Sequence, residues 1–374
     1  MSLTLVTNPA YMHAAFNDVV YSVSSTNSTS TNFQVGCEVK VSGVTIATKF
    51  SKYAPSASVA SFDIGEILSN EILNNSDGTD IMTIGSSGLY SPILQNSALN
   101  YTLTFTEWYD VAGILTSDAT LSVTTISSKP IYAYNMALQE NVFSPESFDQ
   151  YVLDGPTKKF LTNGTLRNRF GESTQVAFLT AEATVKLKYV QYNVFGGSVT
   201  TTTLATTINN NRGIVVIGST LFPLPTTGTR IDRVTIQILN SADVAISEEK
   251  TIYRDIISCN NTMRLEFKNR LGGMDSYTFR KATSDINTRQ ELINVSDIWK
   301  ALTVSGERTI TLEGQEEDND TLTWLGEMHT SKVVYLTDNT SRLRVAIVSS
   351  GDTLSAREPN KPKVKIRLSD PKLN

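Results

Sequence analysis

The chain has 374 residues, more than one hydrophobic core usually organises, so two or three domains are expected. Charged residues make up only 18% of it and hydrophobic residues 40%, with Ser, Thr and Asn in the balance, which favours strands with one wetted face over charged helices. The net charge of −5 gives no general attraction to nucleic acid. The sequence has no run of about 18 apolar residues, so we expect no membrane-spanning helix.

The first predicted domain covers residues 1–129 and is rich in strands. Apolar residues alternate in "NFQVGCEVKVSGVTIATKF", and Ser42-Gly43 within it predicts a hairpin turn. The pattern changes in "SFDIGEILSNEIL", where apolar residues fall on one helical face and Asp63 with Glu66 has the spacing of a capping box. Strand patterns then resume up to Lys129-Pro130, where we expect this domain to end.

The second predicted domain, residues 130–290, is a central β-sandwich. Apolar and polar residues alternate in "EATVKLKYVQYNV", in "RGIVVIGST" and in the segment that begins "RIDRVTIQIL". Turn-forming residues separate these short runs, a spacing typical of sandwiches.

The third predicted domain, residues 291–374, is small and mixed α+β. Leu322, Leu325 and Met328 share one face of a predicted helix over 318–328. In the final strand, "KPKVKIRLS", the cationic residues Lys363, Lys365 and Arg367 alternate with apolar ones. This cationic face is either a solvated face that discourages edge pairing or a candidate interaction face for an acidic neighbouring subunit.

Residue types for catalysis are scarce. The only histidines are His13 and His329, the only cysteines are Cys37 and Cys259, and no Gly-x-Ser-x-Gly elbow is present. We therefore expect no catalytic residues, and we interpret both cysteines as buried thiols. Carboxylate-only chemistry, as in a polysaccharide-degrading enzyme, stays open as a third class of function.

Two acidic segments are candidates for calcium. "NNSDGTD" holds Asp77 and Asp80, and "EGQEEDND" collects five carboxylates, but neither has the EF-hand spacing. The alternative is an exposed turn and an acidic helix start. We expect no metal and no cofactor.

The segment "MRLEFKNRLGGMDSYTF", residues 263–279, has the pattern of a strand, a turn and a strand. Gly272-Gly273 has neither the third glycine nor the Lys-Ser/Thr pair of a phosphate loop. Two glycines permit positive φ, Arg270 is expected to pair with Asp275, and aromatic residues on both sides supply packing. The segment is interpreted as a structural corner.

This corner also carries a resemblance. It is similar to the N-R-L-G-G-F-D-S-Y-T-F signature of structural proteins of tailed bacteriophages that infect Bacteroidota, of the crAss-like or flavobacterial type, with Met274 in place of the usual Phe. "KKFLTNGTLRNR" resembles a second element of these proteins, "DNDTLTWLGEMHTSKVVYL" with "VAIVSS" resembles their closing domain, and "NFQVGCEVKVSG" with "FDIGEIL" fits their first domain. The matching motif residues are Asn269, Arg270, Leu271, Gly272, Gly273, Asp275, Ser276, Tyr277, Thr278 and Phe279.

The resemblance implies a virion structural protein of the tail, neck or baseplate region, and it assigns no catalytic residues. The expected partners are other copies of the chain and neighbouring virion proteins, in a homo-oligomer without nucleic acid or membrane. Residues 1–11 lack the features of a secretion signal, so synthesis in the host cytoplasm is expected. The alternative function is a receptor- or carbohydrate-binding tail module, for which Trp108, Tyr109 and Trp324 would form stacking surfaces.

Overall fold

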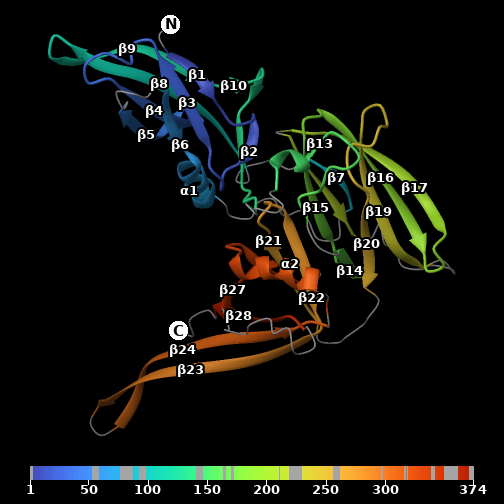
Figure 1. The fold of residues 1–374 in the computed structure, drawn as a ribbon. Helices are drawn as coiled ribbons and strands as arrows, with labels where there is room; N and C mark the ends of the chain where they lie inside the picture. Colours follow the sequence, from blue (N-terminus) through green and yellow to red (C-terminus); the bar gives the residue numbers. More distant parts are fainter. Residues whose placement is uncertain are drawn as a thin grey trace. The chain divides into compact units, whose positions relative to one another are not determined.

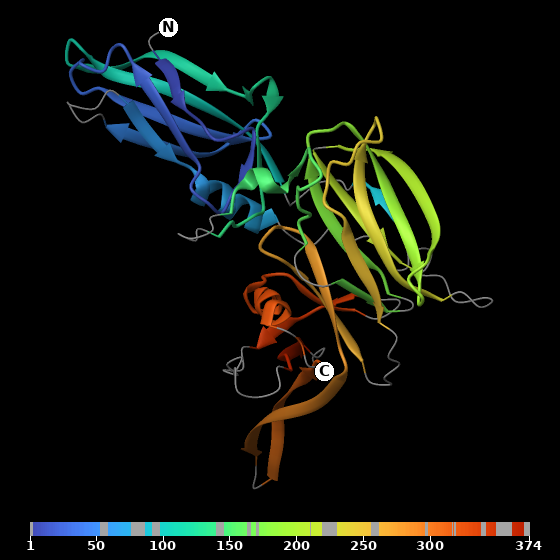
Figure 2. The same cartoon turned by 45° about the vertical axis from the view of Figure 1, so that its right-hand side comes forward.

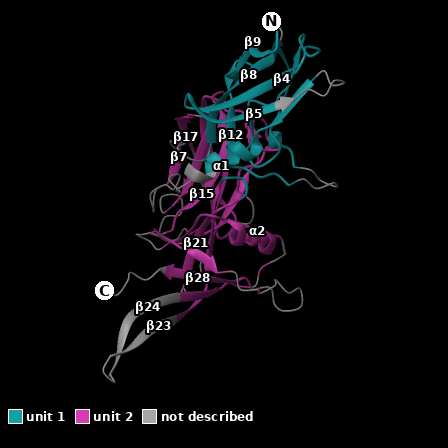
Figure 3. Cartoon of the chain, turned by 90° about the vertical axis from the view of Figure 1, so that its left-hand side faces the viewer, with its two compact units in different colours: residues 1–80, 93–149, 270–272 teal, residues 81–92, 150–269, 273–374 magenta. Residues whose placement is uncertain are grey.

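The structure is a computed structural model, and its architecture is mainly β, as the composition predicts (Figure 1). It describes residues 3–52, 59–75, 87–91, 98–139, 146–162, 166–169, 172–209, 211–218, 230–255, 262–295, 298–315, 317, 319–337, 342–348 and 361–369. The chain divides into two compact units, coloured separately in Figure 3. Unit 1 comprises residues 1–80, 93–149 and 270–272, and unit 2 comprises residues 81–92, 150–269 and 273–374.

Unit 1 is built from two main sheets around one core. A three-stranded sheet has the order β1-β3-β6, and a six-stranded sheet has the order β2-β12-β8-β4-β5 with β9 added to β8. Apolar side chains from both sheets and from one helix form a single hydrophobic cluster. The elements are β1 (Leu3–Thr7), β2 (Met12–Ala14), β3 (Val20–Ser25), β4 (Gln34–Val41), β5 (Val44–Lys52), β6 (Val59–Asp63), α1 (Gly65–Asn75), β8 (Ala98–Val111), β9 (Ile114–Val123), β10 (Thr125–Ile126), β11 (Lys129–Pro130) and β12 (Tyr132–Tyr134).

Local sequence signals account for the first half of this unit. The alternating residues Val35, Cys37 and Val39 are all fully buried, because successive side chains of a strand point to opposite faces. Ser42 and Gly43 both have positive φ (52° and 81°), as a two-residue hairpin turn requires, so the predicted turn is confirmed. The predicted helix is confirmed as α1, and the Asp63 carboxylate accepts a hydrogen bond from the Gly65 amide (2.9 Å) at its start.

The central part of unit 2 is a β-sandwich. One sheet has the order β13-β15-β18-β7 and the other the order β14-β20-β19-β16-β17, with a second hydrophobic cluster between them. Figure 2 shows the two sheets of this sandwich side by side. The elements are β7 (Gly88–Tyr90), a 3₁₀ turn η1 (Phe148–Tyr151) at the junction with unit 1, β13 (Val152–Leu153), β14 (Leu166–Arg169), β15 (Thr174–Thr180), β16 (Thr184–Asn193), β17 (Ser198–Thr207), β18 (Arg212–Ile217), β19 (Ile231–Asn240) and β20 (Lys250–Asp255).

The C-terminal part of unit 2 combines two four-stranded sheets with a helix. The sheet orders are β22-β21-β25-β26 and β23-β24-β28-β27, and helix α2 contributes Trp324, Leu325 and Met328 to a third hydrophobic cluster. The predicted helix is thus confirmed. The elements are β21 (Met263–Lys268), β22 (Met274–Phe279), β23 (Lys281–Val295), β24 (Ile298–Glu313), α2 (Asn319–Thr330), β25 (Val334–Thr337), β26 (Arg342–Arg344), β27 (Ala346–Val348) and β28 (Lys363–Ser369).

The predicted cationic strand is β28, and its position corrects one interpretation. It pairs with β24 on one side, and β27 pairs with its residues 365–367 on the other, so Lys365 and Arg367 do not guard an open sheet edge. Their role as an interaction face stays a prediction. The three domains 1–129, 130–290 and 291–374 also stay a prediction, although the described residues form three hydrophobic clusters.

Candidate functional site: the Asn269–Phe279 corner and a buried arginine network

The backbone of the corner is a tight connection between antiparallel strands β21 and β22. Lys268 lies opposite Met274, and the Asn269 amide donates to the Gly273 carbonyl (2.9 Å). Gly272 has a φ of +80°, which confirms that a glycine of this turn takes the left-handed conformation. A Cβ on Gly272 would lie 2.3 Å from the Asn135 carbonyl oxygen, so this position has no room for a side chain.

Asn269 and Arg270 hold the turn through their side chains. The Asn269 side chain accepts from the Gly273 amide (2.9 Å) and donates to the Leu161 carbonyl (2.8 Å), and it is buried. The Arg270 guanidinium makes two contacts with the Glu146 carboxylate, one of them from Nη2 to Oε1 at 2.7 Å. The expected pair of Arg270 with Asp275 is therefore wrong, because the acidic partner of Arg270 comes from a segment far away in sequence.

Asp275 is a fully buried carboxylate between β22 and α2. Its Oδ2 accepts from the indole N–H of Trp324 (2.6 Å), while its Oδ1 is buried without a hydrogen-bond partner. Burial raises the pKa of Asp275 to about 7, and the Trp324 and Asn269 side chains oppose that shift. Near neutral pH, this carboxyl group is close to the midpoint of its titration.

The remaining motif residues are also committed to internal contacts. The Tyr277 hydroxyl donates to Glu317 Oε1 (2.9 Å), and burial together with Glu317 raises the pKa of this phenol. The Tyr277 ring packs edge-on against Phe279 (centroids 4.9 Å apart), and Phe267 lies 5.8 Å from Trp324. Leu271 and Phe279 have no exposed surface, so the predicted aromatic packing on both sides of the turn is confirmed.

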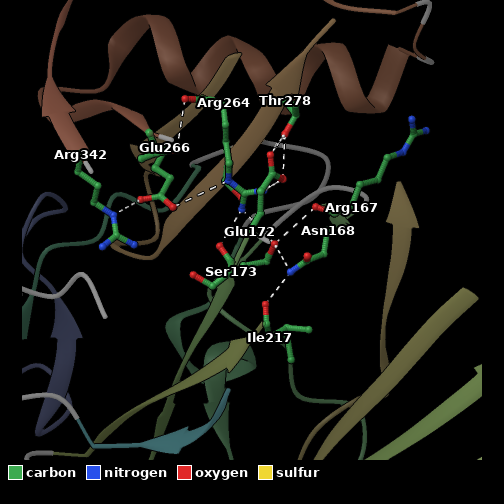
Figure 4. Close-up of polar contacts among 12 residues, drawn as sticks. Arg167, Asn168, Glu172, Ser173, Ile217, Arg264, Glu266, Thr278 and Arg342 are labelled. Carbon is green, nitrogen blue, oxygen red and sulfur yellow. Dashed lines mark hydrogen bonds and ion pairs between the residues drawn. The ribbon is translucent and has the colours of Figure 1, made fainter. Parts of the chain in front are cut away.

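A network of buried ion pairs lies beside the corner, centred on Arg264 of β21 (Figure 4). Arg264 donates from Nη1 to Glu172 (2.6 Å), and from Nη2 to the Ser173 carbonyl (2.9 Å) and to the Ser276 hydroxyl (2.5 Å). Thr174 accepts a further bond (3.1 Å). The guanidinium thus connects the start of β15, in the sandwich, to β21 and β22.

The network continues along β21 to a second arginine. Arg264 Nε lies 3.9 Å from Glu266 Oε1, and Arg342 donates from Nε to Glu266 Oε2 (2.8 Å). Because strand side chains alternate, Arg264 and Glu266 share one face of β21 while Leu265 and Phe267 enter the third hydrophobic cluster on the other. Two arginines and two carboxylates therefore compensate one another inside unit 2.

A shallow hollow that opens to solvent lies next to this network. Its charged lining groups are already paired: Arg167 with Glu317 (3.4 Å) and Arg280 with Asp255 (3.7 Å). Both carboxylates that line the hollow, Asp255 and Glu317, therefore have an arginine as neighbour. The lining residues are Arg167, Asp255, Ser276, Tyr277, Thr278, Arg280, Gln315, Glu317 and Thr321.

Among the other candidate residues that the structure describes, Trp324 bonds to the corner through Asp275, while His13 and Cys37 belong to unit 1. His13 bonds to the Ala10 carbonyl (2.9 Å) and the Tyr101 hydroxyl (3.0 Å), and burial lowers the pKa of its imidazole to about 4. Cys37 is a buried free thiol, and Cys259 lies outside the described residues. Trp324 is only 4% exposed, so it cannot act as an external stacking surface as the carbohydrate-binding alternative required.

The calcium candidates are mostly outside the part of the chain that the structure describes. This holds for Asp77, Asp80, Glu316 and Asp318, whereas Glu317 is described and bonds to Tyr277. Within the described ranges, no three His, Cys, Asp or Glu side chains are grouped as a metal site would need. Neither described helix has the length and apolar character needed to cross a membrane.

Sequence reasoning missed the centre of the network. Arg264, Glu172, Glu266 and Arg342 were not singled out, although "MRLEFK" places three charged residues at alternate positions of a strand whose other face is apolar. That alternation is typical of a strand with one solvated face, so the burial of the charged face could be found only in the structure. No protein-family model matches this chain, and no curated protein is similar to it.

Proposed function

We propose that this chain is a structural component of a tailed bacteriophage particle, in its tail, neck or baseplate region, and that it acts by protein–protein contacts. The observation that carries the proposal is that the segment bearing the resemblance, Asn269–Phe279, is a buried corner whose polar side chains all have internal partners. A segment of this kind holds a scaffold in shape. The side chains of the segment that line the hollow, Ser276, Tyr277 and Thr278, are each hydrogen-bonded internally.

The chemistry of the described residues supports a binding role over catalysis. The charged groups around the hollow and in the arginine network are paired with one another, and the described histidine of unit 1 is buried and hydrogen-bonded. Assembly components work through buried area and complementarity, for which β-sandwich surfaces suffice.

Mass spectrometry of purified particles from the virus that encodes this chain tests the proposal. We expect the chain at a fixed stoichiometry relative to the major capsid protein, and its density at the tail, the neck or the baseplate in images of the particle. Particles that assemble and infect normally without the chain would contradict a structural role. Particles that assemble without it but fail to attach to cells would favour the receptor-binding alternative.

A further inference from the structure

Strand β17 is an open edge of the sandwich. It is the last strand of the order β14-β20-β19-β16-β17, and its only strand partner among the described residues is β16. The pairing runs without interruption from Thr184 opposite Thr207 to Gln191 opposite Thr200. Figures 1 and 2 both show β17 as the outermost strand of its sheet. Among the described residues, no strand pairs with the outer backbone N–H and C=O groups of β17, and such an edge can accept another strand.

The residues of β17 do not protect this edge. The strand reads "SVTTTTLATT", with no charged residue, no proline and no glycine, and it is rich in the β-branched residues that favour strands. Three other described edge strands of six or more residues carry a charged residue that is not buried: Lys49 in β5, Asp118 in β9 and Lys281 in β23. Since charged residues are the usual means of preventing strand addition, β17 differs from these three long edges.

The end of β17 carries a second feature of a contact surface. The β16–β17 turn presents Phe195, which is 91% exposed, next to Val194 at 46%. The Asn193 carboxamide oxygen accepts from the Phe195 amide (2.9 Å) and the Gly197 amide (3.1 Å), so the turn is held in one conformation. An exposed aromatic ring on a fixed turn supplies apolar contact area at low entropic cost.

We propose that β17 pairs antiparallel with β17 of a second copy of this chain, across a two-fold axis near Thr202 and Thr203. An uncharged strand places no like charges opposite each other when it pairs with itself, and an axis between Thr202 and Thr203 sets Thr202 of each copy opposite Thr203 of the other, a favourable cross-strand pair. The joined sheets gain main-chain hydrogen bonds, and each Phe195 lies beyond the end of the partner's strand, where it adds apolar contact. This contact does not depend on where the chain sits in a particle.

The test is the oligomeric state of the full chain in solution. Thr203 is exposed, so Thr203→Lys leaves the core intact while it sets two lysines close to the two-fold axis. In sedimentation equilibrium we expect a dimer for the parent chain, a dissociation constant raised at least about tenfold for Thr203→Lys, and recovery in an equimolar mixture of Thr203→Lys with Thr203→Glu. Thr120→Lys, on the exposed edge strand β9, is the matched control and should dimerise like the parent.

Three outcomes would overturn the contact: a parent chain that stays monomeric at high concentration, a Thr203→Lys variant that dimerises unchanged, or a Thr120→Lys variant that dissociates to the same extent. Melting temperatures of the variants, measured beside the parent, ensure that loss of the dimer is not loss of the fold. A failure here leaves the proposed function standing, since incorporation of the chain into particles is measured separately.

Discussion

At the residue scale, Gly272 combines two constraints that only glycine satisfies. Its φ of +80° is strained for any residue with a Cβ, and that Cβ would meet the Asn135 carbonyl oxygen at 2.3 Å. Gly43 offers a matched comparison, because it has almost the same φ, +81°, but no atom within 4 Å of the Cβ position. The two positions therefore separate backbone strain from crowding.

We expect Gly272→Ala to lower the free energy of unfolding by about 2–4 kcal/mol, the sum of left-handed strain and overpacking. Gly43→Ala should lower the free energy of unfolding by only about 1–2 kcal/mol, because this substitution adds backbone strain without crowding. Chemical denaturation of both variants beside the parent measures the difference. Equal losses at the two positions would show that the packing around Gly272 adjusts freely.

Asp275 gives the protein a pH dependence of known sign. Its pKa is raised from 3.8 to about 7 by burial, so the folded state binds a proton more tightly than the unfolded chain does. The stabilisation from this group is complete below about pH 4 and is lost as the pH rises through about 7. The linked change amounts to about 4 kcal/mol at most, at about 1.4 kcal/mol per pKa unit.

Unfolding free energies of the parent and of Asp275→Asn between pH 4 and pH 8 test this prediction. The advantage of the parent should shrink as the pH rises, because the asparagine carries no titrating proton. Asp18→Asn, at an exposed residue, is the control and should leave the pH profile of the parent unchanged. Parallel profiles for the parent and Asp275→Asn would contradict a raised pKa.

At the element scale, strand β21 is stabilised on its two faces by different physics. Leu265 and Phe267 enter an apolar cluster, while Arg264 and Glu266 form largely buried ion pairs. Removing one member of a buried pair leaves the other charge uncompensated, which usually costs several times more than a surface pair contributes.

We therefore expect Arg264→Met to lower the free energy of unfolding by about 3–5 kcal/mol. The control is Lys40→Met, which breaks the exposed pair of Lys40 with Glu38 (2.7 Å) and should cost at most about 1 kcal/mol. The double variant Arg264→Met with Glu172→Gln should recover part of the loss, because it also neutralises the stranded Glu172 carboxylate. Thermal and urea unfolding measure both losses of stability. An Arg264→Met variant as stable as Lys40→Met would show that the network contributes little to the stability of the fold.

At the scale of the whole molecule, the described charged groups near the hollow and the corner form ion pairs or hydrogen bonds with other residues of the protein. We expect the purified chain to show no hydrolysis of host glycans, peptidoglycan or peptides. The measurement is product release over long incubation with each substrate, with a known glycosidase as the positive control. Turnover that a single carboxylate substitution abolishes, such as Glu317→Gln in the hollow, would establish an enzyme instead.

Most of the local structure was predictable because its causes are local. The alternation around Val35 and Cys37, the Ser42-Gly43 turn, the face of α2 with Leu325 and the left-handed Gly272 all follow from side-chain period and backbone sterics over a few residues. The sequence by itself thus determined the mainly β class, the helices and the nature of the Asn269–Phe279 turn.

Only the tertiary structure decided which distant groups meet. Arg270 bonds to Glu146 rather than to the nearby Asp275, Arg264 bonds to Glu172, and Trp324 is buried on Asp275 instead of facing outward. The strand order likewise put β28 between two neighbours and left β17 at an edge. The physical reason is that a buried charge pairs with whatever polar group the fold brings within about 3 Å, and the strand order decides which strand edges stay open. Sequence distance enters neither of them.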